Sequence, residues 1–171
     1  MTDIDTGTKD VLATVEDGVA TLTLNRPERR NALSRPMLEA LARLLARFEI
    51  DDDVRCVVLT GAGGAFCAGG DVKAMAENDG AGRAGGPAPS YDAVVHRQRV
   101  SQRETAGRLW AMPKPTIAVI PGPAAGAGLS IALACDLRYA ASGAILTTAF
   151  ARVGFAEARA SLRITRLISG C

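Results

Sequence analysis

The stretch over residues 57–73, VVLTGAGGAFCAGGDVK, constrains the fold of this chain more than any other. Its first three residues form a short, β-branched apolar run that is typical of a strand buried on both faces. Asp71 is a favoured helix N-cap, so residues 72–76 can continue as helix. The loop between strand and helix contains Gly61, Gly63, Gly64, Gly69 and Gly70. Such a junction presents free N–H groups to an anion or to developing negative charge.

Two nucleotide-binding motifs are incomplete in this loop. A dinucleotide-binding fingerprint, G-x-G-x-x-G, begins at Gly61 and Gly63 but has Phe66 where the third glycine should stand. A phosphate-binding loop requires G-x-x-x-x-G-K followed by serine or threonine, and the chain contains no such run. A glycine-rich turn without chemistry remains an alternative, because strand-to-helix turns commonly contain glycine.

Length and composition limit the remaining classes of protein. A chain of 171 residues with 48% hydrophobic content can bury one good core, so residues 1–171 are expected to form a single domain. The net charge of +2 is small and scattered, which argues against a nucleic-acid partner. No apolar run approaches the roughly 20 residues of a membrane span, and the polar N-terminus does not resemble a signal peptide. We therefore expect no membrane partner and a cytoplasmic location. The cysteines form no C-x-x-C pair and histidine occurs once, so no metal site is expected.

The beginning of the chain predicts a hairpin. Residues 1–10 lack periodicity and are expected to be a frayed tail. Apolar and polar residues alternate over residues 11–24, around a turn at Asp17 and Gly18, which indicates two antiparallel strands.

A helix and a buried strand are predicted next. Ser34 offers an N-cap before an amphipathic helix whose apolar residues recur from Met37 to Phe48, and the acidic run at residues 51–53 ends it. A strand over residues 54–60 then leads into the glycine loop. This order suggests a β-α-β spiral in which each turn repeats the last.

The second half repeats the same sequence of elements. Residues 78–90 are rich in glycine and proline and predict a mobile loop, either a plain linker or a lid. Residues 91–112 return to helical spacing, with arginines on a solvated face. A buried strand over residues 116–120, a second glycine loop over 122–128 and a helix of small apolar residues follow. Further strands are predicted at residues 137–140 and 144–148, and a weaker helix at 149–167.

Three segments resemble the crotonase family, the enoyl-CoA hydratases and isomerases. They are NRPERRNAL at residues 25–33, GAGGAFCAGGDVK at 61–73 and KPTIAVIPGPAAGAGLSIALACDLRYAA at 114–141. The resemblance covers most of the chain, from Val11 to Leu167. It implies an α/β fold, a β-β-α spiral with buried parallel strands and helices outside. Family members continue past the position of Cys171 into helices, so the chain resembles a member truncated at its C-terminus.

The resemblance also implies a substrate and its binding residues. The substrate would be an acyl-CoA thioester, with coenzyme A as part of the substrate and no separate cofactor, and the protein a homo-oligomer, trimer or hexamer. The backbone N–H groups of Gly70 and Ala127 would form an oxyanion hole that stabilises charge on the thioester oxygen. Contacts to the substrate are implied for Arg30 and Lys73, at the phosphates of CoA, for Ala68, at its adenine, and for the adjacent Asp71.

The carboxylates used by hydratases are absent. Aligned on the second glycine loop and on the strand after it, the two hydratase glutamate positions hold Ser130 and Phe150, and neither can act as general acid or base. A third family position, used by isomerases, falls near Glu157 if one residue is deleted. Without the deletion that position holds Ala158, and Glu157 would be a solvated surface residue.

These residues leave three functions open. Isomerisation of an enoyl-CoA double bond leads, because it needs one carboxylate where hydration usually needs two. Hydration with Ser130 holding a water is the second, and an inactive homologue that binds acyl-CoA without turnover is the third. Asp136 is expected to be structural and His96 to be exposed.

Overall fold

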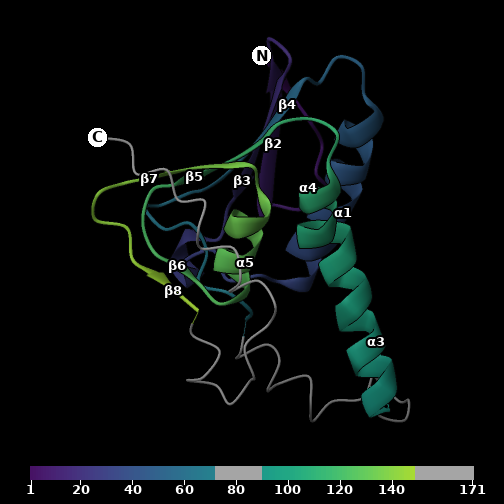
Figure 1. Ribbon diagram of the computed structural model, residues 1–171, viewed down its shortest axis with the longest axis vertical. Coiled ribbons are helices and arrows are strands. Elements are labelled where there is room, and N and C mark those ends of the chain that lie inside the picture. The colour runs from purple at the N-terminus through teal and green to yellow at the C-terminus, as the bar shows by residue number, and fades with distance from the viewer. Residues whose placement is uncertain (72–89, 149–171) are drawn as a thin grey trace.

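The computed structural model describes residues 1–71 and 90–148, and within them a six-stranded and a two-stranded sheet are formed. The large sheet has the strand order β1-β2-β3-β4-β5-β7, and Figure 1 labels its strands other than β1. The first three strands pair antiparallel, whereas β3, β4, β5 and β7 pair parallel. The bounds are Thr2–Asp3 for β1, Val11–Glu16 for β2, Val19–Leu24 for β3, Cys56–Gly61 for β4, Thr116–Ile120 for β5 and Leu137–Ala140 for β7. In the small sheet, β6 (Ala124–Ala125) pairs parallel with β8 (Leu146–Thr147).

The predicted hairpin and its turn are confirmed. Asp17 and Gly18 both have positive φ, 50° and 80°, which is the geometry of a two-residue turn that matches the twist of the flanking strands. Leu22 of β3 pairs with Leu59 of β4, and Leu59 in turn pairs with Ala118 of β5. All three are buried, so one apolar row crosses the centre of the sheet.

The helices follow the expected order with some changes of boundary. Ser34 caps α1 by accepting a hydrogen bond from Met37 N, as predicted. The helix predicted over residues 91–112 forms but contains a π-helical turn over Arg103–Gly107, which separates α3 from α4. The helix after β6 begins at Ala127, within the segment predicted as the second glycine loop. The bounds are Arg35–Ile50 for α1, Tyr91–Gln102 for α3, Arg108–Ala111 for α4 and Ala127–Ala134 for α5.

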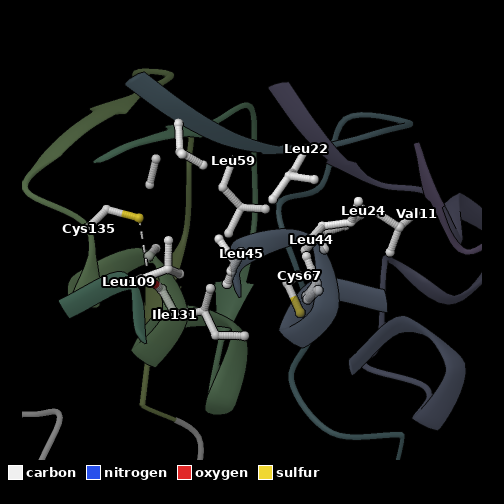
Figure 2. Packing of buried hydrophobic residues seen from close by; sticks show 14 of the residues in the cluster. Val11, Leu22, Leu24, Leu44, Leu45, Leu59, Cys67, Leu109, Ile131 and Cys135 are labelled. Carbon is white, nitrogen blue, oxygen red and sulfur yellow. Dashed lines mark hydrogen bonds between the residues drawn. The ribbon is translucent and has the colours of Figure 1, made fainter. Parts of the chain in front are cut away.

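The core lies between the sheet, α1 and α5. Figure 2 shows Leu22 and Leu59 of the sheet with Leu44 and Leu45 of α1, and Ile131 of α5 beside them. These side chains are buried, with exposed fractions of 0–3%. The apolar face of α1 therefore covers the same face of the sheet that α5 covers.

Burial of the parallel strands on both faces was expected and is wrong for one face. Val57 and Leu59 of β4 are buried toward α1, but Val58 between them is only half-buried. Val119 of β5 is 38% exposed, and Tyr139 of the edge strand β7 is 61% exposed. An unbroken apolar run in a sequence carries no signal for which face stays open, so the sequence could not distinguish the two cases.

The expectation of a frayed N-terminus is also wrong. Strand β1 pairs with β2, and Ile4 N donates to Ala13 O at 2.9 Å. Thr6 is buried and its hydroxyl donates to Val11 O at 2.8 Å. Asp10 is 9% exposed. Local hydrogen bonds of threonine and aspartate side chains order this segment, and such bonds produce no periodic pattern.

Some expectations fall outside the described residues. They are the helix over residues 72–76, the loop over 78–89, Lys73, Phe150, Glu157 and the helix over 149–167. Among the helices of residues 1–71 and 90–148, none combines the length and apolar character that crossing a membrane requires.

Candidate functional site

Asn31 closes the first glycine loop. Its side chain is fully buried, and its Nδ2 donates to Ala62 O at 2.9 Å and to Ala65 O at 2.8 Å. Its Oδ1 accepts from Arg26 N at 2.8 Å. The backbone of Asn31 has φ of +56°, a left-handed conformation that asparagine adopts more readily than most residues. One buried side chain therefore holds the loop against the segment that follows β3.

The two glycine loops are joined by backbone hydrogen bonds. Ala125 N donates to Cys67 O at 2.9 Å, and Phe66 N donates to Pro123 O at 3.0 Å. The first turn of α5 then packs on Cys67: a Cβ on Gly128 would lie 2.6 Å from the Cys67 Sγ, Cβ and O atoms. Position 128 therefore has no room for a side chain, and the close contact fixes the start of α5 against the first loop.

The same packing brings Gly70 and Ala127 into one region. Gly69 has φ of +93°, and a Cβ on it would lie 2.9 Å from Ala125 O and 3.5 Å from Ala127 N. Ala127 is the first residue of α5, where the helix offers its N–H no acceptor. Within the described part of the chain, the N–H groups of Gly70 and Ala127 have no hydrogen-bond acceptor. Two neighbouring free N–H donors of this kind can bind a carbonyl oxygen that gains negative charge.

Ser130, which the family resemblance aligns with one of the two hydratase glutamates, stands in the first turn of α5. Its N–H donates to Gly126 O at 3.0 Å, and its hydroxyl donates to the same oxygen at 3.2 Å. The hydroxyl is thus used in a bond to the preceding helical turn. That bond also holds the peptide unit that carries the Ala127 N–H.

Two charged residues near the first loop differ in their surroundings, because Asp71 is mostly buried in an ion pair and Arg30 is exposed. The Asp71 carboxylate accepts from Arg26 Nη1 at 3.0 Å, and its side chain is only 13% exposed. Arg30 is exposed with φ of +50°, and its carbonyl accepts from Ala68 N at 2.9 Å. Arg30 and Ala68 are thus brought together, whereas Asp71 is turned toward Arg26. Lys73 and Glu157 lie outside the described residues.

Two buried thiols, one in the first glycine loop and one at the end of α5, are not nucleophiles at neutral pH. Burial raises the pKa of the Cys67 thiol to about 11, although the hydrogen bond from Gly69 N opposes the shift. Burial likewise raises the pKa of Cys135 to about 12. Because the thiolate is the reactive form, both side chains act as small apolar groups here.

Other ionisable residues stay apart from the loops. In residues 1–71 and 90–148, no group of three or more histidine, cysteine or acidic side chains is placed to hold a metal ion. His96 is exposed on α3, as predicted. Asp136 accepts from Thr116 N at 2.9 Å and from Thr116 Oγ1 at 2.8 Å, which confirms its structural role between β5 and β7.

The family model described as enoyl-CoA hydratase/isomerase matches residues 14–169. The chain belongs to this family. Its α/β fold with parallel strands is that of the enoyl-CoA hydratases among the solved structures. A structure from Pseudomonas aeruginosa aligns with a TM-score of 0.78 and 37% identity, covering 95% of this chain and 66% of that chain.

Curated relatives in the family differ in the reactions their names describe. A 1,2-epoxyphenylacetyl-CoA isomerase from Escherichia coli is 44% identical over 144 residues, which is 84% of this chain and 52% of the relative. An enoyl-CoA hydratase from Alternaria alternata is 36% identical over 157 residues, 89% of this chain and 48% of the relative. The chain therefore spans about half the length of the curated relatives it matches.

Two residues of the site were not assigned a role from the sequence. Arg26 and Asn31 lie in the NRPERRNAL segment, which contributed to the resemblance only as a motif. Their partners, Asp71 and the carbonyls of the glycine loop, are 31–45 residues away along the chain. A buried polar residue with distant partners gives no periodic signal, and the motif itself was the only available indication.

Proposed function

We propose that this member of the enoyl-CoA hydratase/isomerase family binds an acyl-CoA thioester and places the thioester oxygen between the N–H groups of Gly70 and Ala127. The observation that supports this most is the contact of the first loop with the start of α5, where Gly69 packs beside Ala127 N. Both donors are left without acceptors among the described residues. Fixed donors of this type contribute roughly 3 kcal/mol each to the stabilisation of a developing oxyanion.

Binding of the CoA portion would follow from the residues around the first loop. The pairing of the Arg30 carbonyl with Ala68 N supports a shared contact surface, with the Arg30 guanidinium at a phosphate and the Ala68 carbonyl at the adenine. Lys73 would contribute a second cation. Asp71 would order this segment through its ion pair with Arg26.

The reaction we propose is migration of a double bond from the 3,4 to the 2,3 position. A base removes a proton from the α carbon, the electrons move onto the thioester oxygen as a dienolate, and the proton returns to the γ carbon. The formula of the substrate is unchanged. Glu157 is the proposed base, and one carboxylate can perform both transfers.

Turnover of both positional isomers tests this proposal. The protein would be incubated with a 3-enoyl-CoA and with a 2-enoyl-CoA, and both double-bond migration and water addition would be followed. We expect migration, and hydration far slower than in an enzyme with both glutamates, because each missing acid or base costs roughly 100-fold to 10,000-fold. Rapid hydration without migration would favour the hydratase alternative.

A substitution of Glu157 tests the assignment of the base. Glu157→Gln should abolish migration and leave the affinity for acyl-CoA unchanged, because the amide cannot accept and return the proton. Glu39→Gln is the matched control, since Glu39 is an exposed residue of α1 that pairs with Arg35 in the same helix. If Glu157→Gln isomerises as fast as the control, another residue is the base or the chain is a non-catalytic acyl-CoA binder.

Ser130 offers only limited support for hydration as the second function. Its hydroxyl donates to Gly126 O, yet a hydroxyl oxygen retains the capacity to accept from a water.

A homo-oligomer, trimer or hexamer, is also proposed on the family resemblance. Light scattering of the purified protein distinguishes these states from a monomer.

A further inference from the structure

Arg26 lies in a mostly buried cluster of charges beside the first loop. Its Nη1 is 3.0 Å from Asp71 Oδ2, and its Nε is 3.6 Å from Asp10 Oδ2. The exposed fractions of these side chains are 16% for Arg26 and 13% for each aspartate. The same Nη1 also donates to the backbone carbonyl of Ala32 at 2.8 Å. This bond to a neutral acceptor connects the cluster to the backbone.

The bond to Ala32 begins a chain of peptide units that ends at Gly70. A peptide unit is rigid and planar, so the carbonyl of Ala32 and the N–H of Leu33 point in opposite directions on one unit. Leu33 N donates to Gly69 O at 2.8 Å. The carbonyl of Gly69 and the N–H of Gly70 are the two sides of the next unit. The guanidinium is therefore linked to the Gly70 N–H through two hydrogen bonds and two peptide units.

This chain has two consequences for the Gly70 N–H. Because its peptide unit is held at the carbonyl by Leu33, the direction of the N–H is fixed before any ligand arrives. Hydrogen bonds in series also polarise one another, and a positive charge at the far end makes the last N–H a stronger donor. At Ala127, by contrast, the carbonyl of the same unit accepts from the N–H and hydroxyl of Ser130, which are neutral.

We propose that Arg26 is a positioning residue that aims and polarises the Gly70 N–H through the Ala32–Leu33 and Gly69–Gly70 peptide units. This role rests on the proposed function, because it requires the Gly70 N–H to be a donor to the thioester oxygen. It concerns a residue that contacts neither the substrate nor the reacting atoms. The ion pairs with Asp10 and Asp71 hold the guanidinium in place, and the bond to Ala32 transmits its effect.

The stretching frequency of a bound thioester carbonyl tests this role directly. The probe is butyryl-CoA labelled with carbon-13 at the thioester carbonyl, which is saturated and does not isomerise, and the measurement is isotope-edited infrared spectroscopy of the complex. In the parent protein we expect a shift to lower frequency relative to the free ligand. In Arg26→Met this shift should be smaller, because the hydrogen bonds of the chain lose cooperative strengthening of about 10–30% per bond.

Two variants separate polarisation from stability. Asp10→Asn removes one ion pair of the cluster but leaves the bond from Arg26 to Ala32, so it should lower stability while keeping the carbonyl shift of the parent. Arg26→Lys keeps the charge but lacks the fork that contacts Ala32, Asp71 and Asp10 together, so the shift should be intermediate. If Arg26→Met does not fold, Arg26→Lys and Asp10→Asn serve as the test. A carbonyl shift in Arg26→Lys equal to that of the parent then overturns the proposal.

The possible outcomes are distinct. A folded Arg26→Met protein with the carbonyl shift of the parent overturns the role of Arg26 and leaves the proposed oxyanion hole intact. An equal loss of shift in Asp10→Asn and Arg26→Met means that Arg26 acts only through the stability of the loop. A parent protein that binds butyryl-CoA with no shift overturns the proposed function itself, and the role of Arg26 with it.

Discussion

At the scale of single residues, the site depends on side chains that hold backbone groups in place. Asn31 bonds three backbone groups from one buried position, and Gly128 leaves the space that Cys67 fills. The proposed chemistry uses backbone N–H groups, which every residue except proline can supply. The identity of the neighbouring residues decides whether those N–H groups are fixed in position before the ligand binds.

Two substitutions of Asn31 should separate the contribution of its side-chain hydrogen bonds from that of its left-handed backbone. Asn31→Ala loses the side-chain hydrogen bonds and places alanine at φ of +56°, so it should be strongly destabilising, by about 2–4 kcal/mol. Asn31→Gly loses the same bonds but tolerates the backbone, so it should cost about 1 kcal/mol less. Urea unfolding of the two variants measures the difference. Equal stability of both would mean that the left-handed backbone is not a constraint.

The Cys67 thiol should make stability depend on pH. In the unfolded chain it ionises near its ordinary pKa of 9.0, whereas in the folded protein its pKa is about 11. Above pH 9 the unfolded state therefore binds fewer protons, and the free energy of unfolding falls by about 1.4 kcal/mol per pH unit until about pH 11. Cys67→Ala should reduce the slope of the parent protein by this amount and leave the contribution of Cys135, whose pKa is raised to about 12, whereas Cys56→Ala, at a half-buried position, should keep most of the slope. Parallel profiles for the parent protein and Cys67→Ala would contradict the assignment.

At the scale of elements, α1 and α3 differ in how they are stabilised. Helix α1 buries a continuous apolar face, including Leu41, Leu44 and Phe48, against the sheet. Helix α3 has no buried residue, although both helices begin with a capping serine. The stability of the whole protein should therefore depend on the cap of α1 and not on that of α3.

The two caps provide a matched pair of substitutions. Ser34→Ala removes the acceptor for Met37 N and the donor to Asp10, and should lower the free energy of unfolding by about 1–2 kcal/mol. Ser90→Ala removes the equivalent bond to Ala93 N and should change the free energy of unfolding by less than about 0.5 kcal/mol. Thermal unfolding of both variants measures the contrast. A larger effect at Ser90 would show that α3 contributes to the core.

At the scale of the whole molecule, the sequence predicted the strands, the main helices and the junctions between strand and glycine loop. These features have local signals, such as the β-branched run before Gly61 and the capping serine before α1. The sequence did not predict that the N-terminal segment is ordered. It also did not predict the cluster that Arg26 forms with Asp10 and Asp71. They depend on side chains that lie far apart in the sequence and meet only in the folded chain.

For the candidate site, the sequence predicted the positions of the two donors but not the contact between the two loops. The positions of Gly70 and Ala127 followed from the repeat of strand, glycine loop and helix, together with the family resemblance. The contact between the two loops was not predictable, because it requires Gly69 and Gly128 to meet backbone and side-chain atoms of the other loop. Glu157 and Lys73 remain predictions from the sequence.

Substitution of the proposed CoA contact tests the binding surface of the whole protein. Arg30→Gln should weaken CoA binding and reduce its dependence on salt, because one cation is removed from a phosphate. Arg35→Gln is the control, since Arg35 is exposed and pairs with Glu39 within α1. Calorimetric titration with CoA at two salt concentrations gives both quantities. Equal affinities for the two variants would remove Arg30 from the binding surface.

The proposed function requires the N–H of Ala127 to be one of two donors to the thioester oxygen. Ala127→Pro deletes this N–H at the first position of α5, where proline is well tolerated, and Ala127→Ser keeps it. The measurement is the carbonyl stretching frequency of carbon-13-labelled butyryl-CoA bound to each protein. We predict a shift to lower frequency in the parent and in Ala127→Ser that is largely lost in folded Ala127→Pro. The same shift in all three proteins would contradict the account.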